Sequence, residues 1–253
     1  MKKYIILTLI LFCSSLITAY ELNMLIDNPT AGILQRGEAE ISAKLYKNNG
    51  LNLGTRIGLF PRFMFGVNYG AEQVVGNQEP DWHDRVEFNA KFRIMDESYN
   101  FPAIAIGYDS QGHGNYYKDL KRYDIKSKGV YLVLSKNYAF LGNLGFHLGA
   151  NYSLEDEDKD EDPNFYAGVD KSIGDVLVLI GEYDLAWNDN DNWDQQTMGD
   201  ALNGLGKGYL NASLDIHFTD YLVLKLSMYD ILRNRRDTKG CDRTLTLLYF
   251  MTF

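Results

Sequence analysis

Residues Arg85–Ile94 read RVEFNAKFRI, and polar and apolar side chains alternate along them without a break. A β-strand turns successive side chains to opposite faces, so this stretch has one polar face and one apolar face. The polar face carries charged and amide groups that must meet water, which argues against a core strand of a soluble two-layer sheet. A transmembrane barrel meets both needs, because lipid covers its outside while its inside is polar.

Eleven further segments show the same period of two. Together with 85–94 they make about twelve segments, most of roughly the length that a tilted strand needs to cross a bilayer. The connections between them also alternate, because every second one is short and most of the others are long. The segments are 38–45, 52–59, 63–69, 103–108, 130–135, 146–153, 165–170, 177–184, 210–218, 222–229 and 244–253.

The short connections are 61–62, 96–100, 138–145, 172–176 and 219–221, and the long ones are 71–84, 109–128, 154–163, 187–207 and 233–242. Only the connection 47–50 departs from this alternation. A soluble secreted β-sandwich would not explain why short and long connections alternate. The sequence therefore predicts an all-β protein, a transmembrane antiparallel up-and-down β-barrel of about twelve strands in an outer membrane of the Gram-negative type. Its long loops would be extracellular and both termini periplasmic.

The first residues are typical of a secretory signal peptide. Lys2 and Lys3 precede the apolar run 4–12, which is too short to span a bilayer, and 17–19 (ITA) can serve as a cleavage site. Lipidation of Cys13 is disfavoured by the bulky Phe12 before it. The predicted organisation is a signal peptide at 1–19, a periplasmic lead segment at 20–36 and an outer-membrane β-barrel at 37–253.

Composition excludes several classes of protein. The chain has 25 Lys and Arg against 34 Asp and Glu, and losing Lys2 and Lys3 with the signal peptide gives 23 minus 34, or −11. Such a chain repels phosphates, so nucleic acid is not an expected partner. Past the N-terminus no apolar run is long enough for a membrane helix. Without Cys13, Cys241 remains alone, which excludes an internal disulfide and a cysteine metal cluster.

The polar face of each predicted strand is expected to line the lumen. Its mixed charges fit either a narrow conduit for polar solutes or a lumen closed by ion pairs, and pairing is favoured because a charge in a partly dry lumen needs a partner. Ala103, Ala105 and Gly107 form a small inner face that leaves room for an inward loop such as 109–128. The candidate lumen-lining residues are Arg56, Arg85, Glu87, Lys91, Arg93, His147, Asp170, Glu182, Asp184, Asp215, His217 and Lys225.

Neither a metal site nor catalysis is well supported. The acidic runs 155–162 and 188–194 offer oxygen ligands for calcium, but a solvated loop, bridged by divalent ions at a lipopolysaccharide surface, is favoured. The inward-facing candidates for a hydrolase site are His147 with Ser153 and His217 with Ser213. Neither assembles a nucleophile, a base and an orienting group, so we expect no enzyme activity and no cofactor.

The C-terminus supports the barrel prediction. Phe253 ends an amphipathic segment, which resembles the signal that barrel-insertion machinery recognises in outer-membrane proteins. The expected partners are therefore outer-membrane lipid, lipopolysaccharide and that machinery.

Several motifs resemble the YjbH-like outer-membrane barrel proteins: 25–34 (LIDNPTAGIL) with 36–37 (RG), 102–109 (PAIAIGYD) with Gly112 and Gly114, 127–131 (SKGVY), 135–136 (SK) and 181–184 (GEYD). The chain is shorter than the better-known members and reads GHG at 112–114 where they have GTG. The resemblance implies an accessory of exopolysaccharide production or export, with polysaccharide as a partner and no catalytic residue. The alternatives are a small diffusion pore for polar solutes and a structural barrel with a plugged lumen.

Overall fold

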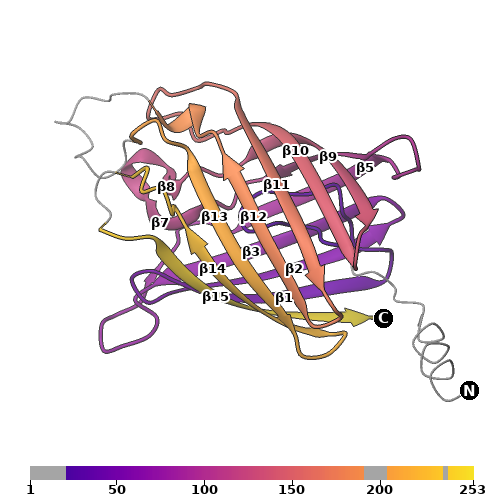
Figure 1. The fold of residues 1–253 in the computed structure, drawn as a ribbon. Coiled ribbons are helices and arrows are strands. Elements are labelled where there is room, and N and C mark those ends of the chain that lie inside the picture. The colour runs from indigo at the N-terminus through magenta and orange to yellow at the C-terminus, as the bar shows by residue number, and fades with distance from the viewer. Residues whose placement is uncertain (1–20, 191–203, 236–238) are drawn as a thin grey trace, which may run out of the picture.

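The computed structural model describes residues 21–190, 204–235 and 239–253, so the predicted signal peptide lies outside the described residues. Twelve long strands form the wall of a barrel (Figure 1). A short strand, β4 (Asp81–Trp82), extends the pairing of β3. The wall strands are β1 (Glu38–Tyr46), β2 (Gly50–Phe60), β3 (Phe63–Glu72), β5 (Glu87–Met95), β6 (Ala103–Asp109), β9 (Gly129–Ala139), β10 (Asn143–Tyr152), β11 (Asn164–Ile173), β12 (Leu177–Asp184), β13 (Tyr209–His217), β14 (Leu222–Tyr229) and β15 (Asp242–Thr252).

The barrel closes between its first and last strands. β1 pairs antiparallel with β15 from Glu38 opposite Thr252 to Leu45 opposite Leu245, and every other neighbouring pair of wall strands is also antiparallel. The predicted fold class is confirmed, and each of the twelve predicted segments overlaps one strand. A closed sheet leaves no unpaired edge, which is what a β-structure needs in lipid.

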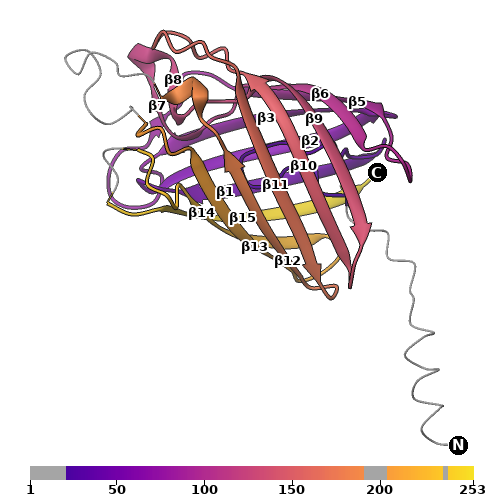
Figure 2. The same ribbon diagram turned by 45° about the horizontal axis from the view of Figure 1, so that its top comes forward.

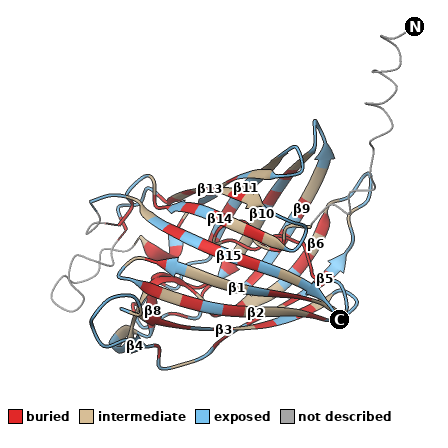
Figure 3. Cartoon of the chain, turned by 90° about the horizontal axis from the view of Figure 1, so that it is seen from below, coloured by how far each residue is buried: buried red, intermediate tan, exposed pale blue. Residues whose placement is uncertain are grey.

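Burial alternates along the wall as the sequence pattern requires (Figure 3). On β5, Glu87 is 1% exposed and Lys91 is 3% exposed, whereas Phe88 and Phe92, each the next residue along the strand, are both 47% exposed. The outer surface is therefore an apolar belt and the inner surface is polar. Within the described ranges, no helix is long and apolar enough to cross a membrane.

The two rims of the barrel differ. The short turns and the C-terminal end of β15 lie at one rim, which we call the short-turn rim, and the long loops lie at the other, the long-loop rim (Figures 1 and 2). The short connection 47–50 lies at the long-loop rim, where Asn48 and Asn49 both have positive φ (57° and 55°) and the Gly50 N–H donates to the Lys47 carbonyl. Asparagine tolerates that backbone conformation better than most residues, so the hairpin needs no long loop here.

Part of one long loop folds back as a hairpin. β7 (His113–Tyr117) and β8 (Arg122–Ile125) pair antiparallel, with the short 3₁₀ helix η1 (Lys118–Leu120) between them. Gly114 has φ +86° and lies against the Asp124 side chain, so a side chain at this position would be strained and would collide. A second short 3₁₀ helix, η2 (Trp187–Asp189), follows β12.

The N-terminal lead segment lies inside the barrel instead of in the periplasm. We call residues 22–34 the plug, because Leu25, Ala31 and Ile33 are almost fully buried there. Both ends of the plug are at the short-turn rim. The prediction of a periplasmic lead segment is wrong for these residues. Their apolar side chains need burial and the charged groups of the bore need partners. Neither requirement produces a local periodicity in the sequence.

Candidate functional site

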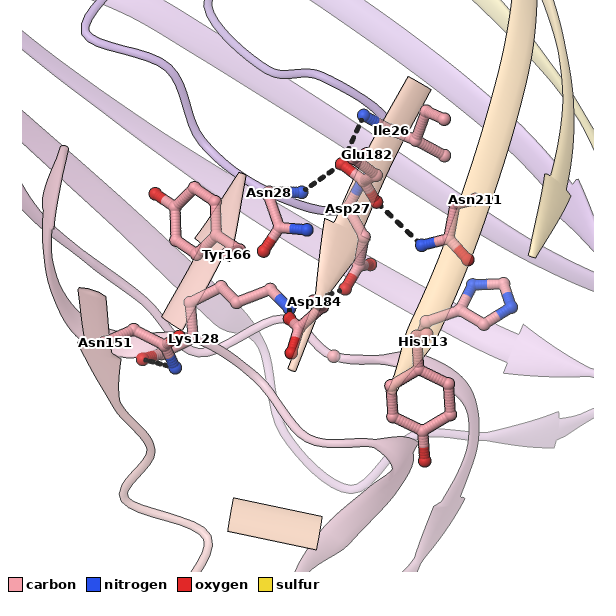
Figure 4. A network of polar contacts seen from close by, with 12 residues as sticks. Ile26, Asp27, Asn28, His113, Lys128, Asn151, Tyr166, Glu182, Asp184 and Asn211 are labelled. Carbon is pink, nitrogen blue, oxygen red and sulfur yellow. Dashed lines mark hydrogen bonds and ion pairs between the residues drawn. The ribbon is translucent and has the colours of Figure 1, made fainter. Parts of the chain in front are cut away.

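The tip of the plug is a tight turn held by one carboxylate from the wall. The Leu25 N–H donates to the Asn28 carbonyl at 2.8 Å. The backbone N–H groups of 26–28 all donate to Glu182 on β12 at 3.0–3.2 Å, and the Asn211 amide donates to it at 2.7 Å (Figure 4). Glu182 is only 2% exposed, so these charge-assisted bonds replace its lost hydration and fix the turn in the bore.

Cations on the opposite part of the wall hold the carbonyls of the plug. Lys91 Nζ donates to the Asn23 carbonyl at 2.6 Å and to the Gly32 carbonyl at 3.0 Å. Arg93 Nε donates to the Ala31 carbonyl at 3.0 Å. Because both cations come from the inward face of β5, this strand binds the two arms of the plug at once.

Three further donors from the wall reach plug carbonyls. They are Lys225 to Leu25, Tyr229 to Ile26 at 3.1 Å and Tyr166 to Pro29 at 3.0 Å. Among the described residues, two plug side chains also have polar partners: Asn23 donates to Glu40 at 2.8 Å, and Asp27 lies 3.1 Å from Lys128, just before β9. Within the same ranges, the other polar contacts from the wall go to the backbone of the plug. The barrel therefore recognises the course of the plug chain more than its side chains.

A serine, a histidine and an aspartate meet on three neighbouring strands. The Ser135 hydroxyl lies 2.7 Å from His147 Nδ1, and His147 Nε2 lies 2.8 Å from Asp170 Oδ1. The Ala31 N–H of the plug donates to the same hydroxyl at 2.8 Å, and all three side chains are buried. In this arrangement the array anchors the plug, because the hydroxyl of Ser135, which is 4% exposed, accepts the Ala31 N–H.

The two serine–histidine pairs weighed from the sequence do not form. His147 lies directly opposite Ser135 in the β9–β10 register, whereas Ser153 is six residues further along the chain, about 20 Å away in an extended strand. The Ser213 hydroxyl donates to Asp215, and His217 is half-buried near the short-turn rim. Period-two patterns assign a face but not the cross-strand register, which is why the sequence missed Ser135.

The other candidate lumen residues all have polar partners, but the side chain of Arg85 is 40% exposed at the long-loop rim and does not line the buried bore. Two of the expected ion pairs join neighbouring strands, Arg56 with Glu40 and Asp215 with Lys225. Asp184 binds Lys128, just before β9, and Glu87 binds Arg85 on its own segment and the Tyr123 hydroxyl of the hairpin. Lys91, Arg93 and Glu182 differ from this pattern, because their main partners belong to the plug.

The acidic runs bind the β7–β8 hairpin from the long-loop side. Arg122 contacts Asp158 and also donates to Asp189 at 3.0 Å, and Lys126 donates to Asp158 at 2.7 Å. Asp158 and Asp189 are buried, so the prediction of solvated side chains is wrong for these two carboxylates. The hairpin supplies their buried cationic partners, which the acidic runs alone cannot reveal. Positions 191–194 of the second run lie outside the described residues. Among the described residues, no group of three or more suitable side chains could hold a metal ion.

The plug and the hairpin meet inside the bore. Leu25 and Ile26 at the plug tip belong to the same buried apolar cluster as Ile125 of β8, together with Tyr209 and Tyr229 of the wall. The bore is therefore occupied from both rims.

The small inner face of β6 receives the plug instead of the predicted loop. Ala31 packs with Ala103 and Ala105 in one buried cluster, while the hairpin within 109–128 lies nearer the long-loop rim. Gly107 lies against the ring of Tyr131. Small side chains do make room for an inward segment, but they do not say which segment takes it.

Burial raises the pKa of Glu155, in the loop after β10, to about 7. Its carboxylate accepts the Tyr123 N–H at 3.1 Å and lies 3.9 Å from Arg85. Between about pH 4.5 and 7, Glu155 therefore keeps a proton in the folded protein that it loses in the unfolded chain. This contribution to stability is fully present below pH 4.5, the ordinary pKa of glutamate, and is lost as the pH rises through 7.

Replacing Glu155 with glutamine should therefore stabilise the protein at pH 8 and change little at pH 4.5. Glutamine keeps an acceptor for the Tyr123 N–H and removes the cost of a buried charge, which is at most about 3 kcal/mol at pH 8. The free energy of unfolding in urea, measured at both pH values, checks this. Equal stabilisation at both pH values would show that the charge of Glu155 is not the cause.

Comparison with known proteins gives one family and one fold. Residues 18–157, more than half of the chain, match the family model YjbH, described as "Exopolysaccharide biosynthesis protein YbjH". No curated protein matches the chain.

Among solved structures, the KdgM porin is similar with a TM-score of 0.52 at 9% identity, covering 84% of this chain and 98% of the porin. Omp33 of Acinetobacter baumannii has a TM-score of 0.46 at 8% identity over 85% and 97% of the two chains. Outer membrane phospholipase A from Escherichia coli has 0.38 at 13% over 91% and 96%. At 9% identity, the similarity to the KdgM porin shows a shared barrel fold and nothing about function.

Proposed function

The chain belongs to the YjbH family, and from that premise we propose that it is an outer-membrane barrel that assists the production or export of exopolysaccharide. One observation carries the proposal: the family match spans residues 18–157, which include the plug, the cations of β5 that hold it and the β7–β8 hairpin. The match therefore covers the device that closes the bore as well as half of the wall.

The proposed orientation follows the asymmetry of the rims. The short-turn rim, with the ends of the plug and of β15, would face the periplasm, and the long loops would face the outside. The strand that ends at Phe253 would present the insertion signal. A permanently open diffusion pore is not favoured, because the plug and the hairpin both occupy the bore. The proposed role needs no catalysis.

Deleting the gene should lower the amount of extracellular matrix polysaccharide, and expressing the full chain from a plasmid should restore it. Matrix sugar is measured by chemical assay after hydrolysis, with the barrel in the outer membrane confirmed by its shift on heating in gel electrophoresis. The control is a strain that lacks an unrelated outer-membrane barrel. Unchanged polysaccharide in the deletion strain, under conditions where the protein is made, would refute the proposal.

A further inference from the structure

Two lysines in the bore bind only neutral groups. Lys91 is 3% exposed and its hydrogen bonds go to two plug carbonyls. Lys44 on β1 contacts His113 Nδ1 at 3.2 Å and the Tyr229 hydroxyl at 2.8 Å. Neither lysine forms an ion pair within the part of the chain that the structure describes. An ammonium shielded from water is stabilised better by an anion than by a neutral acceptor, so both lysines can gain a stronger partner than the neutral groups that they contact here.

The opposite wall presents the complementary chemistry. Glu182 takes N–H donors from the plug and from Asn211, and in the described residues it has no cationic partner within ion-pair distance. Whatever replaces the plug must therefore bring several donors to Glu182 and acceptors to Lys91 and Arg93. Otherwise buried charges would be left unpartnered, which is costly.

The plug can leave without opening the wall. None of its residues joins the strand pairing of the wall. Its β-bridge, between Met24 and Pro29, lies within the plug itself. Its two ends are at one rim: Glu21 contacts Arg93, and the Gly37 N–H donates to the Gly58 carbonyl at 3.1 Å. The β1–β15 pairing that closes the barrel does not involve it. Withdrawal through the short-turn rim would break plug contacts only.

We propose that the plug occupies the binding site of an acidic oligosaccharide, with carboxylates of the sugar binding Lys91, Lys44 and Arg93 and its hydroxyls binding Glu182 and Asn211. A chain of sugar acids carries both carboxylates and many O–H donors. The carboxylates suit Lys91 and Arg93 on β5, and the O–H donors suit Glu182 on β12. The carboxylate of the plug itself, Asp27, binds Lys128 instead and leaves Lys91 and Lys44 without an anion. The inference rests on the proposed function for its choice of sugars over other polyanions.

The first experiment keeps the plug during folding. A site for a specific protease is inserted after Gln35, which is exposed, so that the purified barrel can be cut and the plug becomes a separate peptide. Linear tetragalacturonic acid and the neutral sugar maltotetraose are then titrated, and the released peptide is quantified by mass spectrometry. We expect half-release at a concentration at least about tenfold lower for the acidic sugar, as charge-assisted bonds to the buried cations require.

The second experiment measures binding directly. A variant that lacks 22–34 is titrated with both sugars by calorimetry, alone and with Lys44 and Lys91 changed to glutamine. We expect the double change to weaken binding of the acidic sugar by about tenfold or more, because it removes the buried charge of Lys91 and the part-buried charge of Lys44. The matched control changes Lys118 and Lys121, both exposed cations of the hairpin, and should leave binding within about twofold.

Three results would overturn the proposal: equal release by both sugars, no release by either, or binding that does not depend on Lys44 and Lys91. If release is driven equally by an acidic peptide of the same charge, the site recognises polyanions in general and the sugar assignment falls. These outcomes are independent of the gene deletion, because a purified barrel can bind the sugar whether or not its loss changes the matrix. Failure of the inference and failure of the proposed function are thus distinguishable.

Discussion

Replacing Glu182 with leucine should release the tip of the plug while the barrel stays folded. The substitution leaves the three N–H groups of 26–28 without their acceptor, at a cost of about 1–3 kcal/mol for each buried donor. Even a total of about 3 kcal/mol corresponds to more than about a hundredfold in the population of the released state.

The release can be read from a thiol placed on the plug. Asn28 is fully buried and its side-chain amide has no hydrogen-bond partner among the described residues, so cysteine is a mild replacement. In a background with Cys241 changed to serine, a small thiol reagent should label this cysteine more than about a hundredfold faster when Glu182 is leucine.

Glu97 provides the matched control. In the turn after β5 it accepts the Asn137 N–H at 2.9 Å and the Asn137 side-chain amide at 2.8 Å, so it makes similar bonds without touching the plug. Changing Glu97 to leucine should leave the labelling rate at position 28 within about twofold, because no plug donor loses its acceptor. Equal labelling of the two variants would mean that Glu182 does not hold the plug.

Replacing Arg122 with methionine should loosen the β7–β8 hairpin. The arginine is almost fully buried between Asp158 and Asp189, and removing it leaves two buried carboxylates without their shared cation. Breaking a buried ion pair from one side costs about 3–5 kcal/mol. Hydrogen exchange of the amides of 113–125 should therefore accelerate by at least about a hundredfold, while the amides of the wall strands keep their protection.

Lys121, at the tip of the same hairpin, is the control for this change. It contacts Glu157, but the two side chains are 65% and 43% exposed, so solvent screens the pair and methionine there should leave the stability of the hairpin nearly unchanged. Exchange in the hairpin should then be nearly unchanged. If both variants behave alike, burial of Arg122 does not determine how firmly the hairpin is held.

The wall could be predicted from the sequence because each strand carries its own signal. In 85–94 every residue obeys the alternation, and lipid outside and polar bore inside both select for it. The rims could be predicted from loop lengths alone. The turn at 47–50 departs from the alternation of lengths, and the structure gives the reason: Asn48 and Asn49 both adopt the positive φ that a tight turn needs.

The contents of the bore could not be predicted in the same way. The plug has neither helical nor strand periodicity, and its bonds to Glu182 link residues more than 150 positions apart. The alternation places Lys91 and Glu182 on the polar face of their strands, but nothing local shows that their partners are backbone atoms of 22–34. Ser135 was missed because its meeting with His147 depends on the register between β9 and β10.

The position of the plug constrains the order in which the molecule can be assembled. Its partners come from strands spread around the wall, and its sequence precedes all of them: β1, β5, β9, β11, β12 and β14. A nascent chain therefore carries this segment before any of its binding partners exists. The full set of contacts becomes available only after β14 has been synthesised and placed in the wall, so this early segment can complete its docking only when nearly the whole barrel has formed.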